Sequence, residues 1–106
     1  MKKNTWTWIV VNVISAFVSA SALAQSGADT YKAKCVSCHA ADGSGSTRAG
    51  KSMKAIPFNS PDLVKASDDD LIAATKNGKG KMPAYKGKLT DAQIKDVVAY
   101  IRTLQK

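Results

Sequence analysis

Cysteine and histidine are scarce in this 106-residue chain, which has two cysteines and a single histidine. A structural zinc site normally needs four Cys or His ligands, and only three such residues are available here. The sequence also lacks convincing period-two alternation of apolar and polar residues, internal repeats, low-complexity runs and any linker long enough to divide a domain. These absences argue against a zinc centre, a β-sheet protein and a repeat architecture. We expect a single all-α domain.

All the thiol and imidazole groups of the chain lie in one stretch of five residues, CVSCH at positions 35–39. This C-x-x-C-H pattern is the signature of covalent c-type haem attachment, in which Cys35 and Cys38 each form a thioether bond to one haem vinyl group. His39 is then placed beneath the iron as its proximal ligand. A thioredoxin-like redox pair is one alternative, but such pairs lie near a βαβ pattern that this chain lacks. A chance match within a core helix is the other.

The N-terminal segment has the order of a secretory signal peptide. Two lysines precede an apolar run over residues 6–18, and an A-x-A site ends at Ala24. We expect cleavage after about Ala24, so that residues 1–24 are the signal peptide and residues 25–106 form the mature domain. An uncleaved membrane anchor is the alternative, because the apolar stretch approaches membrane-spanning length. Both tryptophans lie in the segment to be removed, so the cleaved protein should contain none.

Export and charge together limit the compartments in which the protein can lie and the partners that it can bind. Export places the chain in an oxidising compartment, the periplasm or its equivalent, where haem attachment consumes both thiols. The chain has 16 basic and 8 acidic residues, and its formal charge of +8 falls to +6 when Lys2 and Lys3 leave with the signal peptide. An excess of basic residues is compatible with binding to nucleic acid, to an anionic membrane or to an acidic protein. Export makes nucleic acid an improbable partner. We expect a monomer with no stable membrane insertion after the signal peptide is cleaved.

Capping signals predict four helices in the mature chain, the first of which runs into the haem motif. A capping box pairs Ser or Thr with an acidic or amide side chain three residues later, and proline favours the first helical position. Residues 40–51 are rich in Gly, Ser and charge and indicate a surface loop. The predicted starts are Ser26 with Asp29, Ser60 before Pro61 for a short helix to about Ala66, Ser67 with Asp70 for a helix ending at Asn77-Gly78, and Thr90 with Gln93.

The last predicted helix carries an apolar stripe at helical spacing, with Tyr100 at its edge. Gly27 and Ala28 are small enough to let another helix cross the first one closely. Between the loop and the short helix, Met53, Ile56 and Phe58 return apolar side chains, which we assign to a wall of the haem site. The stripe consists of Ile94, Val97, Val98, Ile101 and Leu104.

A glycine- and lysine-rich loop over residues 77–87 contains Met82, which Pro83 follows. Packing gives little reason for a flexible thioether in such a loop, whereas a thioether is a soft ligand that suits low-spin haem iron. With no second histidine in the chain, Met82 is the best candidate for the sixth ligand of the iron. Met53 is the rival candidate, but it lacks the following proline.

Lysines flank Met82 and also precede Cys35. Any single lysine is explained by an ordinary solvent-exposed surface. The cluster favours docking to redox partner proteins with acidic surfaces, which would give fast and salt-sensitive association. The cluster consists of Lys76, Lys79, Lys81, Lys86 and Lys88 around Met82, with Lys32 and Lys34 before the haem motif.

The arrangement resembles the small monohaem class I cytochromes c of bacteria. The resemblance covers nearly all of the mature chain, and least of all residues 40–66. It implies a class I cytochrome c-like fold, in which three to five helices pack around one covalently bound haem and the terminal helices cross. Family members often have a proline whose carbonyl accepts a hydrogen bond from the proximal histidine, and Pro57 is the candidate here. The matching residues are Gly27-Ala28-x-x-Tyr31, Cys35-x-x-Cys38-His39, Gly78, Met82-Pro83, Tyr100 and Leu104.

The resemblance implies an electron carrier that is not an enzyme and has no catalytic residue. One haem c is expected per chain, bound by Cys35, Cys38, His39 and Met82, with His39 and Met82 as ligands of the iron. When His39 and Met82 complete the coordination of the iron, no position is left for a substrate, and the site rearranges little when an electron arrives. Methionine ligation also raises the reduction potential. Two alternatives stay open: a peroxide- or gas-reactive haem protein with a labile Met82, and a haem-binding subunit of a larger redox complex.

Overall fold

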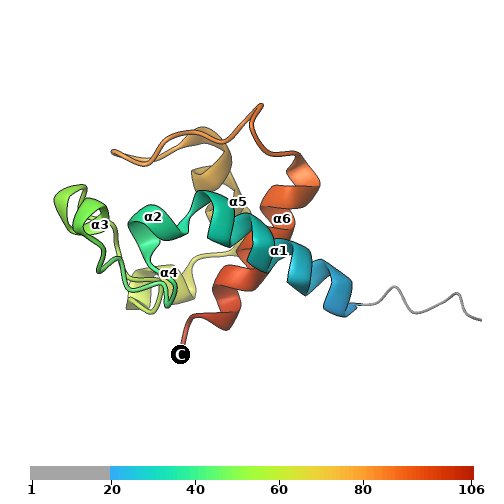
Figure 1. Cartoon of the computed structure of the whole chain (residues 1–106), viewed down its shortest axis with the longest axis horizontal. Coiled ribbons are helices and arrows are strands. Elements are labelled where there is room, and N and C mark those ends of the chain that lie inside the picture. The colour runs from blue at the N-terminus through green and yellow to red at the C-terminus, as the bar shows by residue number, and fades with distance from the viewer. Residues whose placement is uncertain (1–19) are drawn as a thin grey trace, which may run out of the picture.

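Helices follow one another through residues 20–106, the part of the chain that the computed structural model describes, and no strand occurs within it (Figure 1). The all-α prediction is confirmed. No helix among these residues is both long and apolar enough to cross a membrane. The elements are α1 (Ala20–Lys34), α2 (Val36–His39), α3 (Arg48–Ser52), α4 (Pro61–Lys65), α5 (Asp68–Asn77) and α6 (Asp91–Thr103).

The helices of the second half begin where the capping signals predicted. At α5, Ser67 Oγ accepts from the backbone N–H of Asp70 at 3.0 Å, and the Asp70 carboxylate accepts from the Ser67 N–H at 3.4 Å. Thr90 and Gln93 form the same reciprocal pair at α6, at 3.1 and 2.8 Å. Pro61 occupies the first position of α4. The starts of α5 and α6 are local in origin, because each capping box satisfies free N–H groups of its own first turn. At α4 the local signal is Pro61 alone, since the side chain of Ser60 forms no capping hydrogen bond.

Two predictions for the first half are wrong. Helix α1 begins at Ala20, so Ser26 lies inside the helix and does not cap it. Alanine and leucine before Ser26 have high helix propensity, which extends the helix toward the N-terminus. The predicted surface loop over residues 40–51 contains α3, whose cap is Thr47. Signal-peptide cleavage after Ala24 stays a prediction, and residues 1–19 lie outside the described residues.

The core forms where α1 crosses α6 (Figure 1). The crossing is close because of Gly27, where a Cβ atom would collide with the backbone carbonyl of Asp96. The predicted stripe of α6 faces inward: Val97 is 0 % exposed, and Ile94, Val98 and Ile101 are also buried. Full burial of such a side chain contributes about 1.5–3 kcal/mol, so this face supplies much of the stability.

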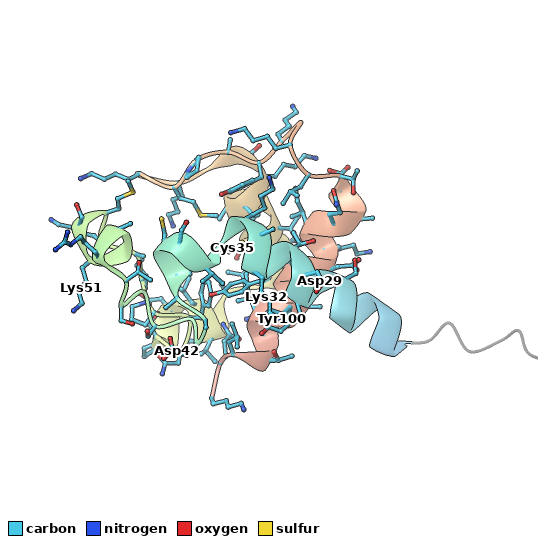
Figure 2. The ribbon with its side chains drawn as sticks, in the orientation of Figure 1. Asp29, Lys32, Cys35, Asp42, Lys51 and Tyr100 are labelled. Atoms are coloured by element: carbon cyan, nitrogen blue, oxygen red, sulfur yellow. The ribbon has the colours of Figure 1, made fainter. Side chains whose placement is uncertain are left out.

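An aromatic cluster extends the core from α1 toward the segment before α4. The ring centroids of Tyr31 and Phe58 lie 6.2 Å apart in an edge arrangement, and those of Tyr31 and Tyr100 lie 5.3 Å apart. Tyr100 lies on α6 near the crossing with α1 (Figure 2). Phe58 belongs both to this core and to the cavity described below.

Arg102 of α6 fixes the connection between α4 and α5. Its guanidinium donates to the carbonyl oxygens of Leu63 at 3.2 Å and Ala66 at 2.6 Å, and to the carboxylate of Asp68 at 2.9 Å. Because hydrogen bonds from a charged donor are stronger than neutral ones, one side chain holds three successive parts of the chain against α6. Leu63 and Ala66 then line the cavity.

Candidate functional site

A cavity of about 820 Å³ lies between the α1–α2 junction, residues 53–58, α5 and the loop after α5. Its volume falls within the range of small-molecule and cofactor sites. The side chains of Cys35, Cys38, His39 and Met82 all line it, so the structure brings together every residue predicted to bind the cofactor. The rival ligand Met53 lines the same cavity and is 47 % exposed.

The two thiols lie on either side of one turn of helix. Cys35 sits at the junction of α1 and α2 (Figure 2), and its N–H donates to the carbonyl of Tyr31 at 2.9 Å. The N–H of His39 donates to the carbonyl of Cys35, also at 2.9 Å. These bonds continue the helical course through the motif, which places Cys35 and Cys38 at the edge of one cavity.

Helix α2 ends at His39, and the residue that caps it, Ala40, has a φ of +68°. A positive φ is uncommon for a residue other than glycine and has to be held by its surroundings. Here the buried hydroxyl of Tyr31 donates to the Ala40 carbonyl at 2.6 Å. Burial also raises the pKa of Tyr31, so the hydroxyl keeps its proton and stays a donor. The end of the haem motif is therefore tied back to α1.

No disulfide joins Cys35 to Cys38. Burial raises the pKa of the Cys35 thiol to about 11, and Cys38 adds a smaller electrostatic contribution. Redox-active C-x-x-C pairs have the opposite property, a nucleophilic cysteine with a lowered pKa. Cys35 therefore lacks the lowered pKa that activates the nucleophilic thiol of a thioredoxin-like pair.

Burial lowers the pKa of His39, which favours the neutral imidazole that binds metals. The imidazole stacks on the ring of Phe58, with centroids 4.7 Å apart and planes at 24°. Its buried Nδ1 has no hydrogen-bond partner among the described residues, and the carbonyl of Pro57 accepts instead from the N–H of Ser60 at 3.1 Å. The hypothesis that Pro57 bonds to His39 is therefore not supported.

The segment before α3 wraps around the carbonyl end of α2, which the sequence did not indicate. Thr47 donates to the carbonyl of Ser37 at 2.7 Å and accepts from the N–H of Gly50 at 2.9 Å. A Cβ atom at Gly50 would collide with the carbonyl oxygens of Cys38 and Gly45. Glycine is required here because two stretches of backbone meet directly behind the cavity wall.

The loop that carries Met82 is anchored at both sides. Within the loop, the N–H and C=O of Met82 pair with the C=O and N–H of Lys79 at 3.0 and 3.3 Å. The N–H of Tyr85 donates to the carbonyl of Thr75 in α5 at 3.0 Å. The hydroxyl of Tyr85 donates to the carbonyl of Lys34, the last residue of α1, at 3.0 Å.

Several lysines line the cavity, but only part of the predicted cluster is among them. Lys76 forms an ion pair with Asp91 at 3.2 Å, and the Lys88 ammonium lies 6.0 Å from the centroid of the Tyr85 ring. The lysines that line the cavity are Lys34, Lys54, Lys79 and Lys81. Of these, Lys54 was not predicted.

Comparisons with known proteins agree with the family that the sequence resembles. The family model described as cytochrome c oxidase, cbb3-type, subunit III matches residues 22–101. Cytochrome c6 of Leptolyngbya boryana is 40% identical over 80 residues, which cover 74% of this chain and 88% of the relative.

Solved structures show the same fold. The KustC0563 c-type cytochrome has a TM-score of 0.70 at 30% identity, over 76% of this chain and 98% of its own. Cytochrome c6 from the diatom Phaeodactylum tricornutum has a TM-score of 0.60 at 26% identity, over 76% of this chain and 91% of its own. The chain therefore belongs to the small monohaem class I c-type cytochromes, which carry a covalently bound haem c.

Proposed function

We propose that this c-type cytochrome is a periplasmic carrier that passes single electrons by outer-sphere transfer through a haem ligated by His39 and Met82. Electron transport and a covalently bound haem c follow from the family. The observation that supports the residue assignment is the shared cavity, which Cys35, Cys38, His39 and Met82 all line. His39 is the single histidine of the chain, so no second imidazole competes with Met82.

The chain's own residues supply attachment, ligation and a dry setting. Bound haem supplies the one-electron chemistry of iron. Cys35 and Cys38 offer thiols at one edge of the cavity, and each is assigned one thioether bond. Phe58 stacks on the imidazole of His39 and limits its rotation.

The apolar lining also favours a positive reduction potential. Leu71, Val97 and Ile101 line the cavity with apolar side chains. Such surroundings disfavour the additional positive charge of the ferric state, and a methionine ligand acts in the same direction. The proposal assigns no residue a catalytic role.

The covalent attachment and the location have a direct test. The full chain is expressed in a bacterium with c-type haem maturation, and the periplasmic product is analysed by intact mass and by reversible reduction. We expect a mass that starts at about Gln25 and includes one haem, no tryptophan fluorescence, and a ferric spectrum that modest cyanide leaves unaltered. A colourless product with two reactive thiols would refute the proposal. The control variant, with both cysteines changed to alanine, should retain no covalent pigment.

We further propose that the lysines at the cavity recognise an acidic redox partner. Lys79 and Lys81 line the cavity in the loop of Met82, and Lys34 lines it from α1. Positive charge around the site of electron exit speeds association with an acidic surface and makes it depend on salt.

Charge reversal tests this docking surface. The variant Lys79→Glu/Lys81→Glu should exchange electrons more slowly with the natural partner at low ionic strength, and the difference should shrink as salt is added. The matched control is Lys65→Glu/Lys95→Glu, which makes the same change of net charge at two lysines of α4 and α6 that do not line the cavity. An exchange rate that ionic strength leaves unchanged in the wild type would contradict the docking proposal.

A second candidate function is a permanent subunit of a larger redox complex. The description of the matching family model, subunit III of a cbb3-type cytochrome c oxidase, favours it. Gel filtration of a native extract separates the two candidates. A diffusible carrier elutes at the size of the small monomer, whereas a subunit elutes with its complex.

A further inference from the structure

We propose that Tyr85 is a positioning residue for the distal ligand, and that its hydroxyl holds the Met82 loop closed against the helix that precedes the haem motif. The inference rests on the proposed function, in which Met82 is the distal ligand of the haem iron. It concerns a hydrogen bond between two chain segments that the sequence separates widely.

The bond joins the two sides of the cavity. Tyr85 Oη donates to the carbonyl oxygen of Lys34 at 3.0 Å, across 51 positions of sequence. Lys34 is the last residue of α1 and directly precedes Cys35. The final carbonyls of a helix have no partner within the helix, so this oxygen is available to a donor from the loop.

The other hydrogen bonds of the loop lead elsewhere. The N–H groups of Tyr85 and Lys86 donate to the carbonyls of Thr75 and Lys76, which belong to α5. The pair between Lys79 and Met82 lies within the loop itself. Among the described residues, no other hydrogen bond joins residues 79–88 to α1 or α2.

Release of Met82 from the iron therefore has a specific structural requirement. Tyr85 is three residues from Met82, and both side chains line the cavity. The loop has to part from α1 for the thioether to withdraw, and this motion breaks the hydrogen bond to Lys34. Burial raises the pKa of Tyr85, which keeps the hydroxyl protonated as the geometry requires. The hydrogen bond thus stabilises the closed, Met82-ligated form.

The test uses the ferric holoprotein and free imidazole as a competing ligand. Tyr85→Phe removes one hydroxyl and keeps the ring. Imidazole affinity is measured from the loss of the methionine–iron charge-transfer band. Because a neutral hydrogen bond shifts such an equilibrium by a modest amount, we expect Tyr85→Phe to bind imidazole about two- to tenfold more tightly than the wild type.

Tyr100→Phe is the matched control, since it removes the same atom from the aromatic cluster of the core. Its imidazole affinity should equal that of the wild type. Equal affinity of Tyr85→Phe and the wild type would overturn the role of Tyr85 alone, as would an equal increase in both variants. A wild-type spectrum without the methionine band would overturn the ligation by Met82 and with it the inference.

Discussion

The two sides of the cavity are held in different ways. The proximal wall, residues 35–50, contains the haem motif and is fastened by hydrogen bonds from Tyr31 and Thr47 and by backbone contact at Gly50. The distal loop, residues 79–88, is largely exposed. It is held by the backbone pair between Lys79 and Met82, by backbone N–H groups that donate to α5, and by one side-chain hydrogen bond. Packed backbone and hydrogen bonds together secure the first. The second depends on hydrogen bonds and on one close approach at its base, where a Cβ atom at Gly78 would meet the carbonyl oxygen of Met82.

This difference separates two requirements of a haem protein. The proximal wall keeps the attachment points and the imidazole fixed, since any displacement there disturbs packed backbone. The distal loop has few buried contacts, and regions of this kind open with the lowest free energy. We expect exchange of the distal ligand to begin in the loop while the proximal wall stays intact.

The largest effect is expected at Gly50. Alanine has the better helix propensity, yet a Cβ atom here collides with the carbonyls of Cys38 and Gly45. Gly50→Ala should lower the free energy of unfolding of the holoprotein by about 2 kcal/mol or more, measured by guanidinium denaturation. Gly80→Ala in the distal loop is the control: nothing lies within 4 Å of its Cβ position and its φ is +59°, so only the backbone cost of about 1 kcal/mol applies. Equal losses of unfolding free energy in Gly50→Ala and Gly80→Ala would contradict the view that the proximal wall is more tightly packed than the distal loop.

A smaller loss is expected when the proximal wall keeps its packing but loses a hydrogen bond. Tyr31→Phe leaves the buried carbonyl of Ala40 without its donor. The free energy of unfolding should fall by about 1–3 kcal/mol. Tyr100→Phe, which removes the same atom from a partly buried ring, should change it by about 0.5 kcal/mol or less. An unchanged free energy of unfolding in Tyr31→Phe would mean that Ala40 keeps its positive φ without the hydrogen bond from Tyr31.

The contrast also explains what the sequence could and could not predict. The capping boxes at Ser67 and Thr90 are local, and both were predicted correctly. The C-x-x-C-H motif indicated the site because its spacing is fixed by the chemistry of attachment. Helix α3 was missed because Thr47 is held by the carbonyl of Ser37, a contact that exists only after folding.

The distal side shows the same limit. Met82 was predicted from its loop and its following proline, but the bond from Tyr85 to Lys34 spans segments with no local relation. The stacking of Phe58 on His39 likewise depends on how residues 53–58 return to the cavity. The apolar character of Phe58 predicted that it would form a wall of the haem site, but it did not indicate that the ring would stack on His39.

The smallest effect is expected at the base of the distal loop. Lys76 and Asp91 form an exposed ion pair at 3.2 Å. Because exposed pairs contribute little, Lys76→Gln should change the free energy of unfolding by less than about 1 kcal/mol and leave imidazole affinity unaltered. A marked rise in imidazole affinity would show that this ion pair, and not the backbone and Tyr85, keeps the loop closed.

The ferric absorption spectrum of the holoprotein tests the central assignment most directly. Wild type is compared with Met82→Ala and with the matched variant Met53→Ala, since both methionines line the cavity. The account predicts that Met82→Ala loses the methionine–iron charge-transfer band and that Met53→Ala keeps it. A band that survives in Met82→Ala and disappears in Met53→Ala would contradict the account.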